Sequence, residues 1–464
     1  MSAKILMTVD LGYGDAGKGT ITDWAARQFG AKLVVRYNGG AQAAHNVVVG
    51  ENDDRRHHTF AQVGSATFIP GIKTLLSKFM LVSPDNFVEE DEHLKACDIH
   101  DAGSRVIVDK RCPITTPFHR AMNRIREMAR SGNRHGSCGQ GIQDTVLDIT
   151  KYKEQMLYAG DLLDPNIARK KLEFLRATKR LDLKEEFDID KLVSENEKIA
   201  EEYKLFTSYD AVGKILETYK KFAATVSFCD GSLVLQEAIN QNQTIIFEGS
   251  QGVLLDEDYG FFPHATRSKT TLRNADTLLN EIGYQGKTYR LGIVRAYGVR
   301  HGTGPFVTED KELAERIPDY HNVMNEWQRE FRVGWFDAVA IKYAIQATGG
   351  IDGLAITCID RIRHEPKINI ATAYALNGAL PLLTIRKYFD LDGDRIIGII
   401  APNPEDLESR ANLTKCLFYC KPVYLPVDQN LRTDTLVSEA LGVPVAVASY
   451  GETWKDKKLL ASMF

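Results

Sequence analysis

A glycine-rich segment near the N-terminus follows directly on a short apolar run, and this order constrains the fold more than any other feature. The apolar run covers residues 5–9, and after it come Gly12, Gly14, Gly17 and Lys18. Closely spaced glycines let successive backbone N–H groups face phosphate oxygens, and the positive end of a helix dipole adds to the attraction. The sequence therefore predicts a strand, a phosphate-binding loop and a helix in succession.

The loop fits the first part of the P-loop pattern and then departs from it. Gly19 occupies the position where a P-loop has the Ser or Thr that binds magnesium, and Asp15 lies inside the loop. An acid among phosphate-binding glycines indicates a role for Asp15 that an ordinary P-loop assigns to other residues. A plain strand-to-helix turn with a solvated Lys18 is the structural alternative.

Composition limits the class of protein. The chain has 464 residues, a net charge of -4, and 44% hydrophobic and 26% charged residues, which is typical of a globular protein with an extended core. It has no Lys/Arg block and no apolar stretch or leader typical of membrane insertion or export, so we expect a cytoplasmic protein that binds neither nucleic acid nor membranes. The seven cysteines are an odd, dispersed set, which we interpret as reduced and mostly buried thiols.

Short apolar runs recur at intervals long enough for helices between them. Such runs are typical of strands buried on both faces of a mostly parallel sheet. We expect one large α/β domain over residues 1–464, with a central sheet flanked by helices. The runs cover residues 5–9, 33–35, 106–108, 245–247, 291–294, 354–357, 396–400 and 443–448.

Residues 165–225 differ in composition from the rest of the chain. They are charged and almost free of glycine, and Val212, Ile215, Leu216 and Tyr219 keep helical spacing. We expect a helical insertion that packs on the sheet within the single domain.

Several segments, taken in order, resemble the adenylosuccinate synthetase family. These purine ligases join aspartate to the 6-position of inosine monophosphate at the expense of GTP. The resemblance implies a central, mainly parallel sheet and a homodimer in which each active site borrows from the partner. The matching segments are the glycine-rich loop and residues 36–46, 247–256, 263–271, 300–309, 332–340, 357–360 and 442–451.

The family's chemistry assigns roles to a few positions. The purine N1 proton is removed, O6 attacks the γ-phosphate of GTP, and the amine of aspartate displaces the 6-phosphoryl group. The resemblance implies that Asp15 is the base and a Mg2+ ligand, and that the backbone carbonyl of Ala44 is a second ligand. It also implies that His45 contacts the transferring phosphoryl group and that Gln251 contacts the purine near O6.

The remaining site positions are implied by the same resemblance. The donor's phosphates are assigned to Gly14, Gly17, Lys18, Gly19 and Thr20, and its guanine to Asp360, Ser449 and Gly451. The purine monophosphate is assigned to Gln42, Ser137, Cys138, Gln251, Thr266 and Arg329. The amino acid is assigned to Arg329 and Arg332, because a guanidinium matches a carboxylate with two parallel donors.

Several binding positions depart from the family's pattern, whereas Asp15, Lys18, His45 and Gln251 keep it. The departures are Ala16 for glutamate, Thr20 for lysine, Gln42 for asparagine, Gln140 for arginine, Cys358 for lysine, and the acid and aromatics of residues 325–332. They leave open a ligase for another purine monophosphate such as GMP or dGMP, for another amino acid, or with ATP as donor. A purine-nucleotide sensor without turnover is a further alternative.

Overall fold

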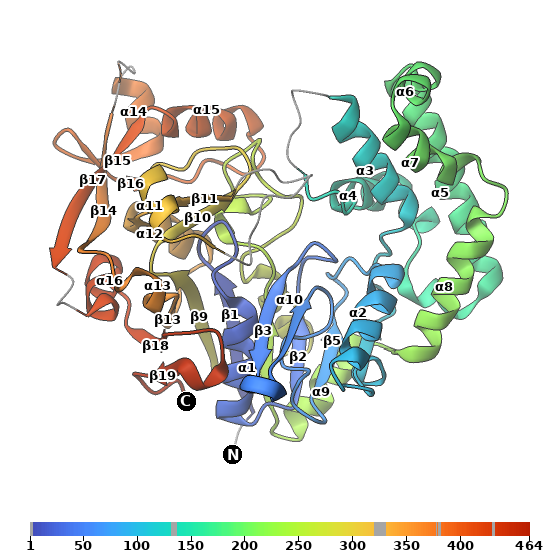
Figure 1. The fold of residues 1–464 in the computed structure, drawn as a ribbon, viewed down its shortest axis with the longest axis horizontal. Helices are drawn as coiled ribbons and strands as arrows, with labels where there is room; N and C mark the ends of the chain where they lie inside the picture. The colour runs from blue at the N-terminus through green and yellow to red at the C-terminus, as the bar shows by residue number, and fades with distance from the viewer. Residues whose placement is uncertain (1–2, 131–136, 320–330, 377, 379–381, 429–431) are drawn as a thin grey trace.

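A ten-stranded sheet forms the centre of the computed structural model, which describes residues 3–130, 137–319, 331–376, 378, 382–428 and 432–464. The strand order is β19-β18-β13-β9-β1-β8-β2-β5-β6-β7, and all neighbours pair in parallel except β18 and β19 (Figure 1). The strands are β1 Lys4–Asp10, β2 Leu33–Arg36, β5 Lys73–Leu76, β6 Val106–Asp109, β7 Ser227–Cys229, β8 Thr244–Glu248, β9 Thr288–Arg295, β13 Gly353–Thr357, β18 Val445–Ser449 and β19 Lys457–Leu459.

Helices cover both faces of this sheet. On β1, Ile5, Met7 and Val9 pack toward α9, α10 and α12, whereas Leu6 packs toward α1 on the opposite face. Alternate residues of one strand point to opposite faces, so burial of both sets explains the continuous apolar runs. The mostly parallel α/β sheet predicted from the sequence is confirmed. These helices are α1 Lys18–Phe29, α9 Gly231–Asn240, α10 Arg273–Glu281 and α12 Ala338–Ala347.

One predicted strand belongs to a different sheet. Residues 396–400 were assigned to the parallel sheet, but β16 pairs antiparallel with β14 and β15 in a second sheet that is formed by strands from residues 336–428. The side chains of Ile397 and Ile400 are exposed, so this run is buried on one face only. The second sheet contains β12 Phe336–Asp337, β14 Lys367–Leu376, β15 Phe389–Asp392, β16 Arg395–Ile399 and β17 Cys420–Asp428.

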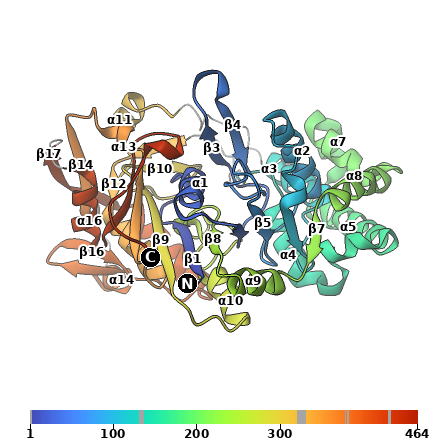
Figure 2. The same cartoon turned by 90° about the horizontal axis from the view of Figure 1, so that it is seen from below.

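Residues 165–225 form the expected helices. Asp164 caps the first by accepting from the backbone N–H groups of Asn166 and Ile167, and Pro165 occupies its first turn. These helices pack mainly on α2 and α3, at the β7 edge of the sheet, rather than across its face (Figure 2). The helices are α2 Pro84–Ala96, α3 Pro117–Ala129, α5 Pro165–Glu186, α6 Ile189–Glu195, α7 Glu197–Thr207 and α8 Ala211–Thr225.

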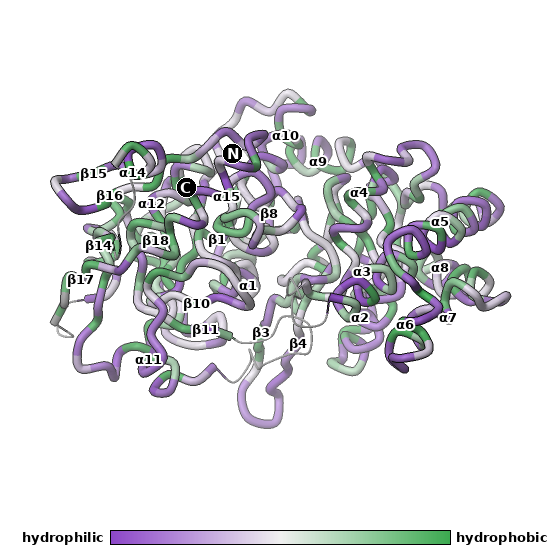
Figure 3. Tube along the Cα trace, turned by 90° about the horizontal axis from the view of Figure 1, so that it is seen from above, coloured by the Kyte–Doolittle hydropathy of each residue, from purple (hydrophilic) through white to green (hydrophobic). Residues whose placement is uncertain are grey.

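Hydropathy alternates along these outer helices, as expected for helices with one buried stripe (Figure 3). The chain also forms two two-stranded antiparallel sheets and several shorter helices. They are β3 His45–Val49 with β4 Arg56–Phe60, β10 Gly298–His301 with β11 Phe331–Gly334, and α4 Ile142–Tyr152, α11 Lys311–Arg316, α13 Ile359–Ile362, α14 Leu382–Tyr388, α15 Leu407–Leu417 and α16 Thr433–Leu441.

The carboxyl ends of β1, β8 and β2 lie side by side, because these three strands are neighbours in the sheet. Ligands of open α/β sheets bind at this edge. The three loops that leave these strands contain six of the residues that the sequence selects, which are Gly14, Asp15, Gly17, Gln42, Ala44 and Gln251.

Candidate active site

The glycine-rich segment joins β1 to α1 as predicted. Gly17 precedes the helix with a φ of 82°, a left-handed conformation that glycine adopts without cost. Close packing explains why position 19 is a glycine, because a Cβ there would lie 2.9 Å from the Cβ of His45. A Ser or Thr at this position would push α1 away from β3, so the departure from the P-loop pattern brings the loop close to His45.

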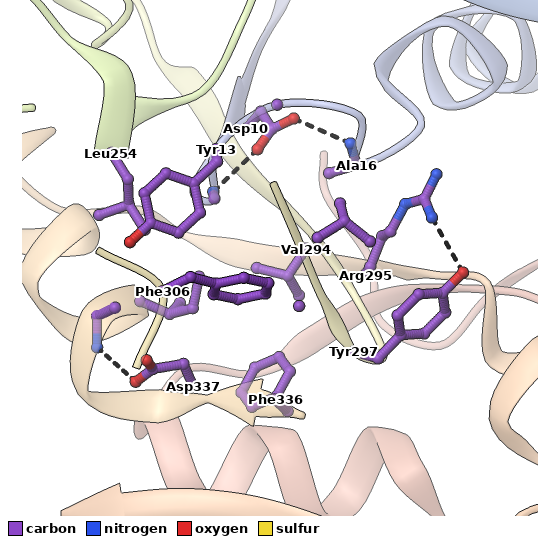
Figure 4. Close-up of a pocket in the computed structure, with 16 residues that line it drawn as sticks. Asp10, Tyr13, Ala16, Leu254, Val294, Arg295, Tyr297, Phe306, Phe336 and Asp337 are labelled. Atoms are coloured by element: carbon purple, nitrogen blue, oxygen red, sulfur yellow. Dashed lines mark hydrogen bonds between the residues drawn. The ribbon is translucent and has the colours of Figure 1, made fainter. Parts of the chain in front are cut away.

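Asp10, which the sequence analysis missed, organises the loop from inside (Figure 4). Its buried carboxylate accepts from the backbone N–H groups of Gly12 (2.9 Å) and Ala16 (3.0 Å) and from Lys18 Nζ (2.8 Å). Two loop N–H groups therefore point inward, and the charge of Lys18 is balanced within the protein. An acid at the last position of a strand that enters a glycine loop is the signal that could have indicated this role.

Asp15 is held by its backbone while its side chain stays one-quarter exposed. It has a φ of 59°, and its carbonyl oxygen accepts from Arg295 Nε at 2.6 Å. His301 Nε2 lies 3.4 Å from Asp15 Oδ2, and the His301 ring packs 4.8 Å from that of Phe331. Arg295 and His301 were not predicted either, because their proximity to Asp15 comes from strands distant in sequence.

His45 forms a buried pair with Glu248, at the end of β8. Its Nδ1 lies 2.6 Å from Glu248 Oε1, and burial lowers the pKa of His45 to about 4 despite the nearby carboxylate. Burial would raise the pKa of Glu248, but Arg36 and the hydrogen bonds from His45 and Ser65 outweigh it and lower that pKa to about 2. At neutral pH, His45 therefore donates Nδ1–H to a carboxylate. Its buried Nε2 has no partner among the described residues, so it is available to a ligand.

This pair makes stability sensitive to acid. The folded pKa of His45, about 4, lies below the usual value of 6.5. Its contribution to the free energy of unfolding is therefore present above pH 6.5 and is lost as pH falls toward 4. We expect urea unfolding to show a loss of roughly 2 to 3 kcal/mol between pH 7 and pH 4.5, and His45→Asn to lose less over the same interval. Equal losses in both proteins would contradict this.

The loops after β2 and β8 meet at Gln42 and Gln251. Gln42 Nε2 donates to Gln251 Oε1 at 3.3 Å, and Gln251 has a φ of 60°. Asn38 and Ser250 exchange hydrogen bonds beneath them. The structure therefore brings two of the predicted purine-contacting side chains together.

The segment that begins at Ser137 lies beside this pair. A Cβ at Gly40 would come within 3.0 Å of both Gln42 Oε1 and Ile142 Cδ1, the latter in the first turn of α4. Ser137 Oγ donates to Asn123 Oδ1 at 3.0 Å, and Cys138, which follows it, is partly buried.

Gln140, in the same segment, has a buried Oε1 without a partner among the described residues. The structure also places Thr266, which follows β8 in the chain: its backbone N–H donates to the Leu255 carbonyl at 2.7 Å.

Arg332 is already engaged by a carboxylate. Its Nε donates to Glu309 Oε1 at 3.0 Å, its Nη2 donates to the second oxygen of the same carboxylate, and Nη1 donates to the carbonyls of Gly302 and Gly304. An amino-acid carboxylate would have to displace Glu309. Arg329 lies outside the described residues.

The residues assigned to the donor's base also come together. Thr20 Oγ1 donates to the Glu452 carbonyl at 2.9 Å, which joins the first turn of α1 to the turn after β18. Ser449 ends β18, and its Oγ donates to the Gly451 carbonyl at 3.2 Å. Asp360 lies in α13, after β13, the strand that pairs with β18. Segments far apart in the sequence thus flank one end of α1.

The described residues contain no group of three or more His, Cys, Asp or Glu side chains arranged to hold a metal ion. A metal here would need ligands from backbone and substrate, as Mg2+ commonly has. Within the described part of the chain, no helix is long and apolar enough to cross a membrane. All seven cysteines are free; three are buried and four partly exposed, so the prediction of mostly buried thiols was too strong.

Comparisons with known proteins identify the family of this chain. The sequence profile described as adenylosuccinate synthetase matches residues 7–391. The chain belongs to the adenylosuccinate synthetase family. The adenylosuccinate synthetase of Neisseria gonorrhoeae is 32% identical over 381 residues, covering 81% of this chain and 82% of the relative. That of Dehalococcoides mccartyi is 31% identical over the same length. Family members are carbon–nitrogen ligases of purine biosynthesis, and so is this chain by class.

Solved structures of the adenylosuccinate synthetase fold match almost the whole chain. Fully ligated adenylosuccinate synthetase from Plasmodium falciparum aligns with a TM-score of 0.75 and 18% identity over 99% of this chain and 100% of that one. Cyanophage S-2L succinoaminodeoxyadenylate synthetase, bound to dGMP and dATP, aligns with a TM-score of 0.58 and 14% identity over 100% and 97%. These alignments include residues 392–464, beyond the profile match, where Ser449 and Gly451 lie.

Proposed function

We propose that this protein joins L-aspartate to the 6-position of an inosine monophosphate-like nucleotide, through a 6-phosphoryl intermediate formed with GTP. One observation carries the proposal. The loops at the ends of β1, β2 and β8 converge, with the accessible carboxylate of Asp15 on the first, Gln42 on the second and Gln251 on the third. His45, whose Nε2 has no partner within the part of the chain that the structure describes, packs against the helix that follows the first loop.

Asp15 and His45 each contribute to one step of the proposed reaction. Asp15 accepts the purine N1 proton, which makes O6 nucleophilic enough to attack the γ-phosphorus of GTP. His45 Nε2 approaches a transferring phosphoryl oxygen, whose negative charge favours protonation of the ring while Glu248 holds Nδ1. The aspartate amine then attacks C6, and the phosphoryl group leaves as inorganic phosphate with O6.

A magnesium ion fits the residues present. Asp15 offers a partly exposed carboxylate, and the exposed Ala44 offers a backbone carbonyl directly before β3. Both are hard oxygen donors, and the donor's phosphates would supply the others. When bound, magnesium neutralises phosphate charge as it develops.

A second candidate keeps the reaction and changes a substrate. Two observations favour it. The buried Oε1 of Gln140 has no partner among the described residues, and Glu309 already occupies Arg332. The cyanophage relative with this fold is bound to dGMP and dATP. GMP, dGMP, an amino acid other than aspartate, and ATP as donor are therefore the alternatives to test.

An assay of phosphate release distinguishes the proposed ligase from a ligase with other substrates and from a nucleotide sensor. We expect release only when GTP, inosine monophosphate and aspartate are present together with Mg2+, and none when any one is omitted. Release with GMP or dGMP, with another amino acid or with ATP instead would establish the second candidate. Tight nucleotide binding without release in any combination would establish a sensor and contradict a ligase.

We propose a homodimer as the assembly, as the family resemblance implies. Light scattering at micromolar concentration should give twice the chain mass of 51.9 kDa. A mass of one chain under the conditions of full turnover would contradict a shared site.

A further inference from the structure

A buried lysine without an assigned role lies next to the candidate donor-base residues. Lys457 begins β19, directly opposite Ser449 of β18, and only 9% of the residue is exposed. Its Nζ donates to the carbonyls of Gly451 at 2.8 Å and of Thr453 at 2.7 Å. These two bonds place the ammonium against the turn that the family resemblance assigns to the donor's base.

Burial and the neighbouring acidic groups act in opposite directions on the charge of Lys457. Burial lowers the pKa of Lys457 to about 8, while the neighbouring Asp456, Cys358, Asp23 and Asp360 act in the opposite direction. Asp360 is the acid assigned to the donor's base, and Cys358 occupies a position where the family has lysine. The ammonium therefore shares one electrostatic environment with both residues.

The hydrogen-bonding capacity of Lys457 is not exhausted. An ammonium group carries three N–H donors and no acceptor, and the two carbonyls account for two of them. A third donor remains for a ligand, and the carboxylate of Asp360, which acts electrostatically on Lys457, is an acceptor. The edge of a 6-oxo purine has the matching pair, an acceptor at O6 and a donor at N1. Adenine reverses both.

We propose that Lys457 determines donor specificity by donating to the 6-oxo oxygen of the donor's base while Asp360 accepts from N1–H. This inference rests on the proposed function only in placing the donor's base at this end of the site. In this arrangement Lys457 provides, from β19, the positive charge that Cys358 cannot provide at the position where the family has lysine. It therefore predicts selection of GTP over ATP.

Calorimetric titration of the full chain with GTP, ITP and ATP, each with Mg2+, tests the proposal. ITP lacks the 2-amino group, so it isolates recognition of the 6-oxo oxygen. We expect Lys457→Met to weaken GTP and ITP binding by roughly ten- to hundredfold, the range for a hydrogen bond to a charged group, with ATP binding unchanged. Lys457→Arg should restore part of the preference.

Lys458→Met is the matched control, because Lys458 is the exposed neighbour on the same strand. We expect it to bind all three nucleotides as the unmodified protein does. Equal weakening of GTP and ATP in Lys457→Met, with a lower Tm, would mean that Lys457 only holds the turn and would overturn the proposal. So would unchanged binding of GTP and ITP. Failure of turnover in the unmodified protein would contradict the proposed function instead, since these titrations need no phosphate release.

Discussion

Asp15→Asn should lower the rate of phosphate release by about a hundred- to ten-thousandfold, the contribution of general acid–base catalysis. The amide cannot accept the purine proton, and it is a weaker ligand for a metal. Asn tolerates the left-handed backbone that Asp15 adopts at a φ of 59°, so the fold should persist. The measurement is kcat under saturating substrates, with Tm as the check on folding.

Asp98→Asn is the matched control for this substitution. Asp98 has a φ of 62°, close to that of Asp15, but it lies exposed after α2, away from the three loops. We expect its kcat to be unchanged. If Asp15→Asn kept full turnover, Asp15 would not be the base.

His45→Asn should lower kcat by about a hundred- to thousandfold, as removal of one preorganised donor to a developing charge does. The Asn amide can take the place of Nδ1 and keep the bond to Glu248, whereas nothing replaces Nε2. The KM for the purine monophosphate should change little, because the lost contact belongs to the transferring phosphoryl group.

His45→Gln provides the complementary control. Its amide nitrogen can take the place of Nε2, so we expect it to retain more kcat than His45→Asn while losing the bond to Glu248. If His45→Gln lost more activity than His45→Asn, the pairing with Glu248 would matter more than Nε2.

Much of the central sheet could be predicted from local pattern. Buried parallel strands produce continuous apolar runs, so residues 5–9 and 245–247 were recognisable as strands. The run at 396–400 has the same composition, but it lies in an antiparallel sheet and some of its side chains are exposed. An unbroken apolar run does not reveal which of its side chains are exposed. The helices of 165–225 were predictable because their spacing is periodic.

The candidate site was predictable only in part. Asp15, Gln42 and Gln251 lie in segments whose order resembles the family, and the fold brings those segments together. Asp10 carries a local signal that was overlooked. His301 and Lys457 carry none. His301 approaches Asp15 only in the folded chain, and Lys457 is placed beside Ser449 by the pairing of β19 with β18.

The pairing of Arg332 with Glu309 illustrates a further limit of sequence analysis. A guanidinium at a matched position predicts a carboxylate partner, and the structure provides one from the protein itself. Resemblance identifies the type of group that Arg332 binds, but it cannot distinguish a substrate carboxylate from an internal one that competes with it.

The central claim is that the purine O6 attacks the donor's γ-phosphorus. Inosine monophosphate labelled with 18O at position 6 tests this directly, by mass spectrometry of the phosphate released with GTP and aspartate. The account predicts that each phosphate carries the purine's 18O. Unlabelled phosphate alongside formation of the aspartate adduct would contradict it.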